Sequence, residues 1–265
     1  MTRAVWLTDI HINFLKPVQL EKFYQLINDS HPDCILISGD IGEAPRLKYY
    51  LQQLESRLPC PIYFVLGNHD YYGASQQDVK VLVQQLTIVS PRLHWLILDG
   101  IVELAKNVGL LGHDGWADGR YGDYATSQIM LNDYVAIRDF VGLNKVQRLG
   151  LLNKLGDSAA GYIREWLPKA LDRYDHVFFM THVPPFPEAC IHEGRYYNDE
   201  WLPHFASKAV GDALVKVMLD YPDKQLTVLC GHTHGQIEAQ ILDNLRVMTG
   251  GAEYGRPEIQ RVFEL

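Results

Sequence analysis

Residues 3–89 repeat one arrangement three times: a short apolar run, then a polar motif, then an amphipathic segment. The apolar runs are residues 3–8, 33–37 and 61–66, and the amphipathic segments are residues 17–30, 45–58 and 75–89. The runs are typical of buried strands, whereas apolar residues at helical spacing predict helices in the segments. Strands that alternate with helices predict parallel strands joined by right-handed crossovers, and therefore an α/β fold.

Each of these predicted strands ends in a polar motif. The motifs are, in chain order, Asp9-Ile10-His11, Gly39-Asp40 and Gly67-Asn68-His69-Asp70. Ligands of parallel sheets bind outside the carboxyl ends of the strands. We therefore expect the three motifs to converge on one site.

The second half of the chain is more varied. We expect strands at residues 94–98, 101–104 and 108–111 with hairpin turns between them, then helices at residues 129–139, 144–153 and 158–174. A strand at residues 177–181 ends in His182. After an irregular stretch at 187–204 and a helix at 206–221, a strand at 226–230 ends in Gly231-His232-Thr233-His234. The tail predicts antiparallel strands at residues 237–241, 246–248 and 259–263. No linker composition divides the chain, so we expect one domain over residues 1–265.

Composition limits the class of protein. Of the 265 residues, 47% are hydrophobic and 21% charged, which is ordinary for a globular protein. The net charge of −8 argues against binding nucleic acid by charge, but it leaves a phosphate substrate open because bound cations invert the local field. Four scattered cysteines favour buried free thiols, and neither a membrane span nor a signal peptide is apparent. We therefore expect a cytoplasmic protein without a membrane partner.

The motifs together supply two carboxylates, one amide oxygen and four imidazoles, with His69 left over. This mixed oxygen and nitrogen set suits a pair of divalent transition metals better than Ca²⁺ or Mg²⁺, and it differs from cysteine-rich structural zinc sites. Taken singly, each residue has an ordinary alternative as a helix N-cap or turn residue. The ligand candidates are Asp9, His11, Asp40, Asn68, His182, His232 and His234.

These motifs, in this order over nearly the whole chain, resemble the signature of the calcineurin-like metallophosphoesterase family. The resemblance implies a four-layer α/β/β/α sandwich of two mixed sheets with a small helical or loop cap. It implies two divalent metal ions, with Mn, Fe or Zn as the usual candidates. Matching by motif gives one metal to Asp9, His11 and His234, and the other to Asn68, His182 and His232. Asp40 would bridge the two.

The resemblance also implies the reaction. A hydroxide that bridges the metals would attack phosphorus, and His69 would protonate the leaving oxygen or stabilise the transition state. Asp70 would orient His69 and keep it cationic, as an orienting carboxylate does in a triad.

The substrate is less constrained than the reaction. Serine/threonine protein phosphatases of the superfamily carry an arginine soon after the Gly-Asp motif and a glutamate after Asn-His, but here the residues are Gly42-Glu43 and Asp70. We therefore expect a small phosphomonoester or phosphodiester as the substrate. A protein phosphatase, a nuclease of the superfamily and a non-catalytic metal-binding scaffold remain alternatives.

Residues 113–157 and 187–204 are expected cap insertions. Within or near them, four side chains are candidates for contacting the substrate, although each could equally belong to an ordinary aromatic-rich surface loop. They are His113, Arg195, Tyr71 and His192.

Overall fold

Strand β1 (Arg3–Leu7) shows how the layers are built. In the computed structural model, which describes residues 1–265, Ala4 and Trp6 point into one core while Val5 and Leu7 point into another. Successive side chains of a strand point to opposite faces of its sheet. A strand covered on both faces is therefore apolar throughout, which explains the continuous apolar runs in the sequence.

The first sheet has the strand order β13-β1-β2-β3-β4. Strands β1 to β4 run parallel, which confirms the prediction for the first three, and β13 pairs antiparallel with β1. Leu7 pairs with Ile37, and Ile37 with Phe64, so that these strands end side by side. The remaining strands are β2 (Cys34–Ser38), β3 (Ile62–Val65), β4 (Leu93–Trp95) and β13 (Arg261–Glu264).

The second sheet has the order β11-β12-β10-β7-β6-β5 and is also mixed. Its four central strands are parallel, whereas β11 and β5 join the edges as antiparallel hairpins. The strands are β5 (Val102–Ala105), β6 (Val108–Gly112), β7 (His176–Met180), β10 (Gln225–Cys230), β11 (Ile237–Leu242) and β12 (Leu245–Thr249).

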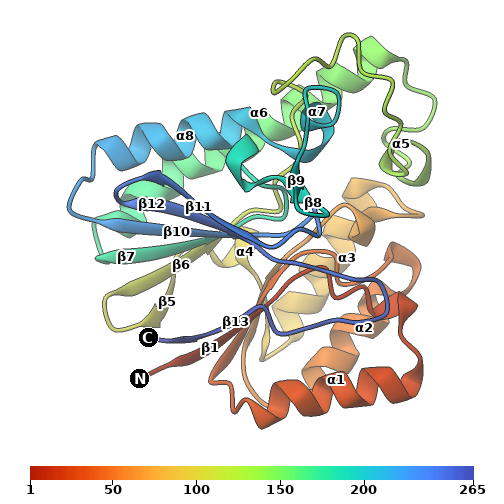
Figure 1. The fold of residues 1–265 in the computed structure, drawn as a ribbon. Coiled ribbons are helices and arrows are strands. Elements are labelled where there is room, and N and C mark those ends of the chain that lie inside the picture. Colours follow the sequence, from red (N-terminus) through yellow and green to blue (C-terminus); the bar gives the residue numbers. More distant parts are fainter.

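The two sheets pack face to face, and helices cover the outer face of each (Figure 1). Trp6, Phe178 and Leu229 are among the residues that fill the core between the sheets. A second core lies under α1 (Pro17–Asp29), α2 (Ala44–Arg57) and α3 (Gln76–Val89). A third lies under α6 (Lys145–Leu171) and α8 (Lys208–Leu219). The predicted α/β/β/α sandwich of two mixed sheets is confirmed.

Helix α6 corrects one prediction. Residues 144–153 and 158–174 were expected to form two helices, but they form one continuous helix. Gly156 lies inside this helix and packs closely: a Cβ there would lie 2.5 Å from the Cβ of Asp118. The helix begins with a capping box in which Asn144 and Gln147 bond each other's backbone N–H.

Two further predictions are wrong in the part of the chain that follows residue 93. The predicted strand at 94–98 ends at Trp95 and continues as the short helix α4 (Leu96–Asp99). This helix takes the chain from one sheet to the other, so the turn at 99–100 does not form a hairpin. The helix expected at 129–139 is reduced to the single turn α5 (Asp133–Ala136).

The irregular stretch at 187–204 contains a small hairpin of β8 (Ile191–His192) and β9 (Arg195–Tyr196). Its two turn residues, Glu193 and Gly194, both have positive φ, at 48° and 74°. Positive φ at both central residues is the requirement of a type I′ hairpin turn. The helical turn α7 (Leu202–Phe205) follows and leads into α8.

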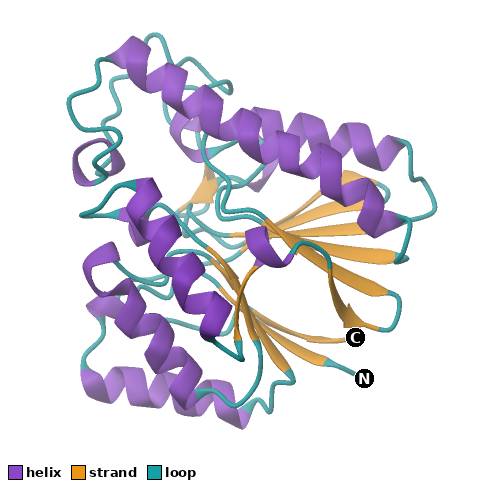
Figure 2. Cartoon of the chain, turned by 180° about the vertical axis from the view of Figure 1, so that it is seen from behind, coloured by secondary structure: helices purple, strands orange, loops and turns teal.

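The two termini lie side by side, at the same end of the sheets in both ribbon views (Figures 1 and 2). Thr2 and Leu265 exchange backbone hydrogen bonds of 2.8 and 2.9 Å. None of the helices combines the length and the apolar character that crossing a membrane requires.

Candidate metal centre

The polar motifs converge where the two sheets meet, at the carboxyl ends of five parallel strands. Asp9 and His11 follow β1, Asp40 follows β2, and Asn68 and His69 follow β3. From the second sheet, His182 follows β7, and His232 and His234 follow β10. Because neighbouring strands are in register, their ends meet at one edge, and all seven predicted ligands meet there.

The backbone at this edge is strained. Five of the seven residues have a left-handed conformation, with φ of 47° at Asp9, 40° at His11, 55° at Asp40, 70° at His232 and 58° at His234. Non-glycine residues rarely adopt this conformation, and when they do it is commonly at functional sites. Here it turns consecutive polar side chains toward one point.

Glycines let the loops approach closely. A Cβ at Gly67 would lie 2.2 Å from Asp40 Oδ1, and one at Gly231 would lie 2.0 Å from Asp9 Oδ2. A Cβ at these distances would displace both carboxylates, so the motifs that begin at Asn68 and His232 need the glycine that precedes each.

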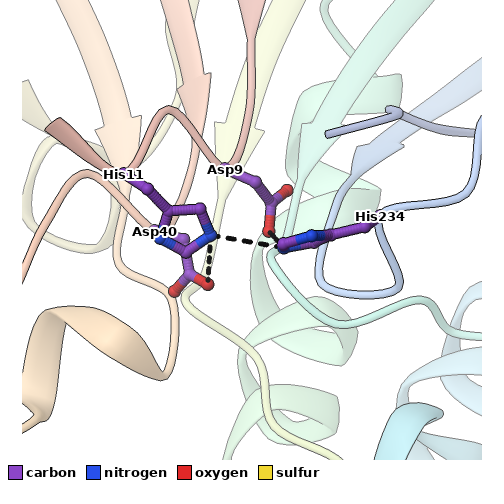
Figure 3. A group of neighbouring side chains, drawn as sticks. All are labelled: Asp9, His11, Asp40 and His234. Atoms are coloured by element: carbon purple, nitrogen blue, oxygen red, sulfur yellow. Dashed lines mark hydrogen bonds and ion pairs between the residues drawn. The ribbon is translucent and has the colours of Figure 1, made fainter. Parts of the chain in front are cut away.

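One half of the site consists of Asp9, His11, Asp40 and His234 (Figure 3). Their ligand atoms all lie within 4.8 Å of one another. The Nε2 atoms of His11 and His234 are 3.2 Å apart, and His234 Nε2 lies 3.3 Å from Asp9 Oδ1. Such a group of buried carboxylates and imidazoles can hold a divalent cation.

The other half consists of Asn68, His182 and His232. Asn68 Oδ1 lies 3.0 Å from His182 Nε2 and 3.0 Å from His232 Nδ1. Asp40 lies between the halves, because its Oδ1 is 3.4 Å from His182 Nε2 and its Oδ2 is 3.7 Å from His11 Nε2. The carboxylate thus faces a different half with each oxygen.

Backbone carbonyls fix the tautomers of two of these histidines. His182 Nδ1 donates to the Ser38 carbonyl at 2.9 Å, and His232 Nε2 donates to the His204 carbonyl at 3.2 Å. The other nitrogen of each neutral ring is then an acceptor that faces the acceptor Asn68 Oδ1. A proton on His182 relieves one of these contacts, whereas a single cation bound among the three groups relieves both. The donor set therefore fits a metal ion.

The charges of the site are coupled. Burial opposes ionisation of Asp9, but the hydrogen bond from His234 and the charge of His182 lower its pKa to about 2. Burial likewise disfavours the His182 imidazolium, yet the Asp40 and Asp9 carboxylates raise its pKa to about 10. Burial lowers the pKa of His11 to about 4 and that of His232 to about 3. The Asp9 and Asp40 carboxylates thus favour positive charge on His182 and would favour a bound cation in the same way.

His69 lies beside this group. Its Nε2 is 3.9 Å from Asp40 Oδ2, and its ring stacks on Tyr72 with centroids 4.3 Å apart. It lines a cavity of about 560 Å³ that opens onto the site. His69 is therefore adjacent to both the candidate ligands and the space in which a substrate would bind.

Asp70 does not orient His69 as expected. Its Oδ2 accepts the backbone N–H of Asp40 at 3.0 Å and of Gly67 at 2.8 Å. Its Oδ1 accepts the N–H of Ile41 and Gly42, each at 2.9 Å. Both oxygens are occupied by main-chain donors, so Asp70 instead binds the loop after β2 to the loop after β3.

Two predicted substrate contacts lie elsewhere. His113 Nδ1 accepts the N–H of Gly115, and the His113 ring packs 5.4 Å from that of Tyr162 on α6. The Tyr71 hydroxyl donates to Asp114 Oδ2 at 2.8 Å inside the core. Neither residue lines the cavity.

His192 and Arg195 do line the cavity, where the β8–β9 hairpin forms part of its wall. Arg195 is exposed and forms no ion pair, which leaves its guanidinium available to an anion.

Sequence reasoning missed two residues near the site: Asp133 and Tyr254 both line the cavity. Asn68 Nδ2 donates to Asp133 Oδ1 at 2.8 Å, and the Tyr254 ring lies 4.6 Å from that of His11. Asp133 and Tyr254 stand in no recognisable motif, so only the fold brings them to the site.

Sequence comparison identifies relatives. The calcineurin-like phosphoesterase family matches residues 2–236. A Danio rerio protein named "Transmembrane protein with metallophosphoesterase domain" is 29% identical over 130 residues, which cover 42% of this chain and 29% of that protein. A Bos taurus protein of the same name is 34% identical over 92 residues, which cover 32% of this chain and 20% of that protein. The chain thus spans less than a third of the length of these curated relatives.

Structure comparison agrees on the fold. The phosphopantetheinyl hydrolase of Mycobacterium tuberculosis has a TM-score of 0.71 at 13% identity, with 96% of this chain and 90% of that chain covered. A dimetal phosphatase from Danio rerio has a TM-score of 0.55 at 14% identity, with 94% of this chain and 87% of that chain covered. The family match confirms the predicted resemblance. The chain belongs to the calcineurin-like phosphoesterase family.

Proposed function

We propose that this chain uses two divalent metal ions to hydrolyse a phosphomonoester or phosphodiester of a small substrate. The observation that carries the proposal is the position of Asp40, whose Oδ1 faces His182 and whose Oδ2 faces His11. A carboxylate that turns one oxygen to each of two ligand groups can hold two cations close together.

Each of the two cations would then have its own set of protein ligands. Asp9, His11 and His234 would complete one site, and Asn68, His182 and His232 the other. Imidazole, carboxylate and amide oxygen together suit Mn, Fe or Zn. When bound, such cations supply an activated water and neutralise the charge of the phosphate.

The chain's own groups would do the rest. His69 lines the cavity beside the ligands and can donate a proton to the leaving oxygen. Arg195 and His192, on the wall formed by the β8–β9 hairpin, can bind a further anionic or polar part of the substrate. The hairpin would therefore act as a cap element, as would residues 113–157, which supply Leu131, Asn132 and Asp133 to the wall.

A small substrate is favoured over a phosphoprotein. The cavity of about 560 Å³ has the volume of a small-molecule site. Its wall includes the aromatic side chains of Tyr72, Tyr197, Trp201, Phe205 and Tyr254. A non-catalytic scaffold is disfavoured because none of the candidate ligands is missing. The four cysteines are free and buried, which supports a reducing compartment such as the cytoplasm.

The test is a substrate panel on reconstituted protein. Metal is removed with EDTA, and Mn, Fe, Co or Zn is added back before aryl monoesters, aryl diesters, cyclic nucleotides, dinucleoside polyphosphates and phosphopeptides are assayed. A phosphopantetheinyl compound belongs in the panel because a protein of the same fold is named as its hydrolase. Chelation should abolish hydrolysis and add-back should restore it. Activity that ignores chelation, or a preference for phosphopeptides, would contradict the proposal.

A further inference from the structure

Asp133 holds one candidate metal ligand in a defined orientation. Its carboxylate is buried, with 4% of the residue exposed, at the start of α5 in the segment 113–157. Asp133 Oδ1 lies 2.8 Å from Asn68 Nδ2. Since a carboxylate only accepts hydrogen bonds, the amide must present its N–H to Asp133 and its oxygen to the histidines.

This orientation decides whether Asn68 can bind a cation. A flip of the amide would place an NH₂ group 3.0 Å from His182 Nε2, where Asn68 Oδ1 now lies. An amide nitrogen has no free lone pair for a metal and carries hydrogens of partial positive charge. The group containing His182 and His232 would then lose its only oxygen ligand apart from Asp40.

The same carboxylate oxygen also binds Tyr72, whose hydroxyl donates to Asp133 Oδ1 at 2.6 Å. The ring of Tyr72 stacks on His69, with centroids 4.3 Å apart and planes at 26°. Asp133 is therefore connected to Asn68 directly and to His69 through Tyr72.

Main-chain bonds keep Asp133 in place. The N–H of Gly73 donates to the Ala136 carbonyl at 2.9 Å, and the N–H of Arg138 donates to the Ala74 carbonyl at 3.0 Å. The turn that carries Asp133 is thus fixed to the loop that carries Asn68 and His69.

We infer that Asp133 is a positioning residue: it orients the Asn68 amide for the second metal ion, the one that Asn68, His182 and His232 would hold. Through Tyr72, Asp133 also fixes the ring of His69. The inference rests on the proposed two-metal function. It gives the segment 113–157 a part in metal binding in addition to covering the site.

The test compares cation binding by Asp133→Ala, Asp133→Asn and the wild type. Asp133→Ala should lower the affinity for the second Mn²⁺, the ion at Asn68, His182 and His232, by about 10- to 100-fold, the usual range for loss of an outer-shell partner. The affinity for the first Mn²⁺ should be unchanged. In Asp133→Asn the side-chain oxygen can still accept from Asn68 and Tyr72, so affinity should return to near the wild-type value. Calorimetric titration measures both affinities, and electron paramagnetic resonance distinguishes a coupled Mn²⁺ pair from a single ion.

Further variants separate positioning from folding. Asp139→Ala removes a carboxylate of the same segment that accepts the N–H of Gln76 at 2.7 Å, so it should lower stability without changing either affinity. Asp133→Glu displaces the carboxylate by one methylene and should lower the affinity for the second ion. This variant tests the inference even if Asp133→Ala does not fold. Tyr72→Phe should retain both ions.

The outcomes are distinguishable. A wild-type protein that takes up no second cation overturns the two-metal proposal and this inference together. Wild-type binding of two ions, with unchanged affinities in Asp133→Ala and Asp133→Glu, overturns only the role of Asp133. Equal loss in Asp133→Asn and Asp133→Ala would also overturn it, because the acceptor oxygen would then not be what matters.

Discussion

The carboxylate of Asp70 accepts the backbone N–H of Asp40, with 3.0 Å between Asp70 Oδ2 and the nitrogen. Three further N–H groups, from Gly67, Ile41 and Gly42, point at the same carboxylate. Asp40 stands in a left-handed conformation, with φ of 55°, that the chain does not adopt without support. Asp70 therefore acts on the site by holding the backbone of Asp40.

Replacing Asp70 by asparagine should destabilise the protein and loosen the metal centre. The amide keeps one acceptor oxygen and brings an NH₂ group against N–H donors, so at least one buried N–H is left without a partner. We expect a loss of about 2–4 kcal/mol in the free energy of unfolding, together with reduced metal content. Denaturant unfolding of the metal-free protein measures the first, and elemental analysis the second. Normal stability and metal content with slow turnover would instead support the orienting role toward His69.

Replacing Asp40 by asparagine should remove activity and lower metal content. The amide has nearly the same shape, but it has no charge and only one oxygen that can bind a cation. The two groups of ligands would therefore no longer share an anionic bridge. Elemental analysis after reconstitution should show fewer ions per chain, and turnover of an aryl phosphoester should fall to background. Full turnover with two ions bound would show that Asp40 does not bridge them.

Replacing His69 by alanine should keep both ions and slow the reaction. His69 is not needed as a ligand in the proposed arrangement, so metal content should stay at the wild-type level. The loss of a proton donor to the leaving oxygen predicts a decrease in kcat of roughly 10²–10⁴-fold. The decrease should be smaller for substrates with an acidic leaving group such as a nitrophenol, which needs no proton. Loss of metal in this variant would identify His69 as a ligand instead.

Much of this site is predictable from sequence because its residues follow from strand periodicity. Parallel strands bring their carboxyl ends together, so a polar motif directly after each apolar run is enough to place Asp9, Asp40 and Asn68 at one edge. Cover on both faces of the first sheet follows from the same runs, since a strand that is apolar at every position must be covered on both faces. The second sheet as one of those covers was expected only from the family resemblance. No distant contact has to be known for these steps.

The errors arise where tertiary contacts decide. The role of Asp70 depends on main-chain donors from two loops, and adjacency in sequence suggested His69 as its partner instead. The two helices expected at residues 144–153 and 158–174 form one helix, in which Gly156 packs closely against Asp118. Asp133 reaches Asn68 only because the turn at α5 packs onto the loop after β3, and local sequence carries no sign of that packing.

Replacing Arg195 by alanine should weaken binding of substrates that carry a second anionic group. Arg195 lines the cavity and forms no ion pair of its own, so its charge is available. We expect an increase of about tenfold in KM for a dinucleoside polyphosphate, equivalent to about 1.4 kcal/mol, with little change in kcat. An aryl monoester should be affected less. Arg138→Ala is a matched control, because that exposed arginine pairs with Asp78 away from the cavity. Equal effects on both substrates would show that Arg195 does not bind the second anionic group.

Acidification should destabilise the protein through His204. This side chain is buried, with 2% of the residue exposed, and its two ring nitrogens contact Tyr134 and Ser127. Burial, followed by the charge of Arg148, lowers its pKa from 6.5 to about 4. Between these values the unfolded chain takes up a proton that the folded protein does not. The contribution of His204 to the free energy of unfolding is therefore fully present above pH 6.5. It is lost as the pH falls toward 4, and the loss amounts to roughly 3 kcal/mol.

The measurement is urea unfolding over a series of pH values with a chelator present, so that release of metal ions does not contribute. His204→Gln offers hydrogen-bonding groups to the same neighbours and cannot titrate. Its stability at pH 7 should be lower because the packing is altered, but its free energy of unfolding should fall less steeply between pH 6.5 and 4. His113, whose pKa burial also lowers to about 4, should behave in the same way in His113→Gln. If the slope in His204→Gln equals that of the wild type, His204 is not the group that titrates, and the acid sensitivity must come from other histidines.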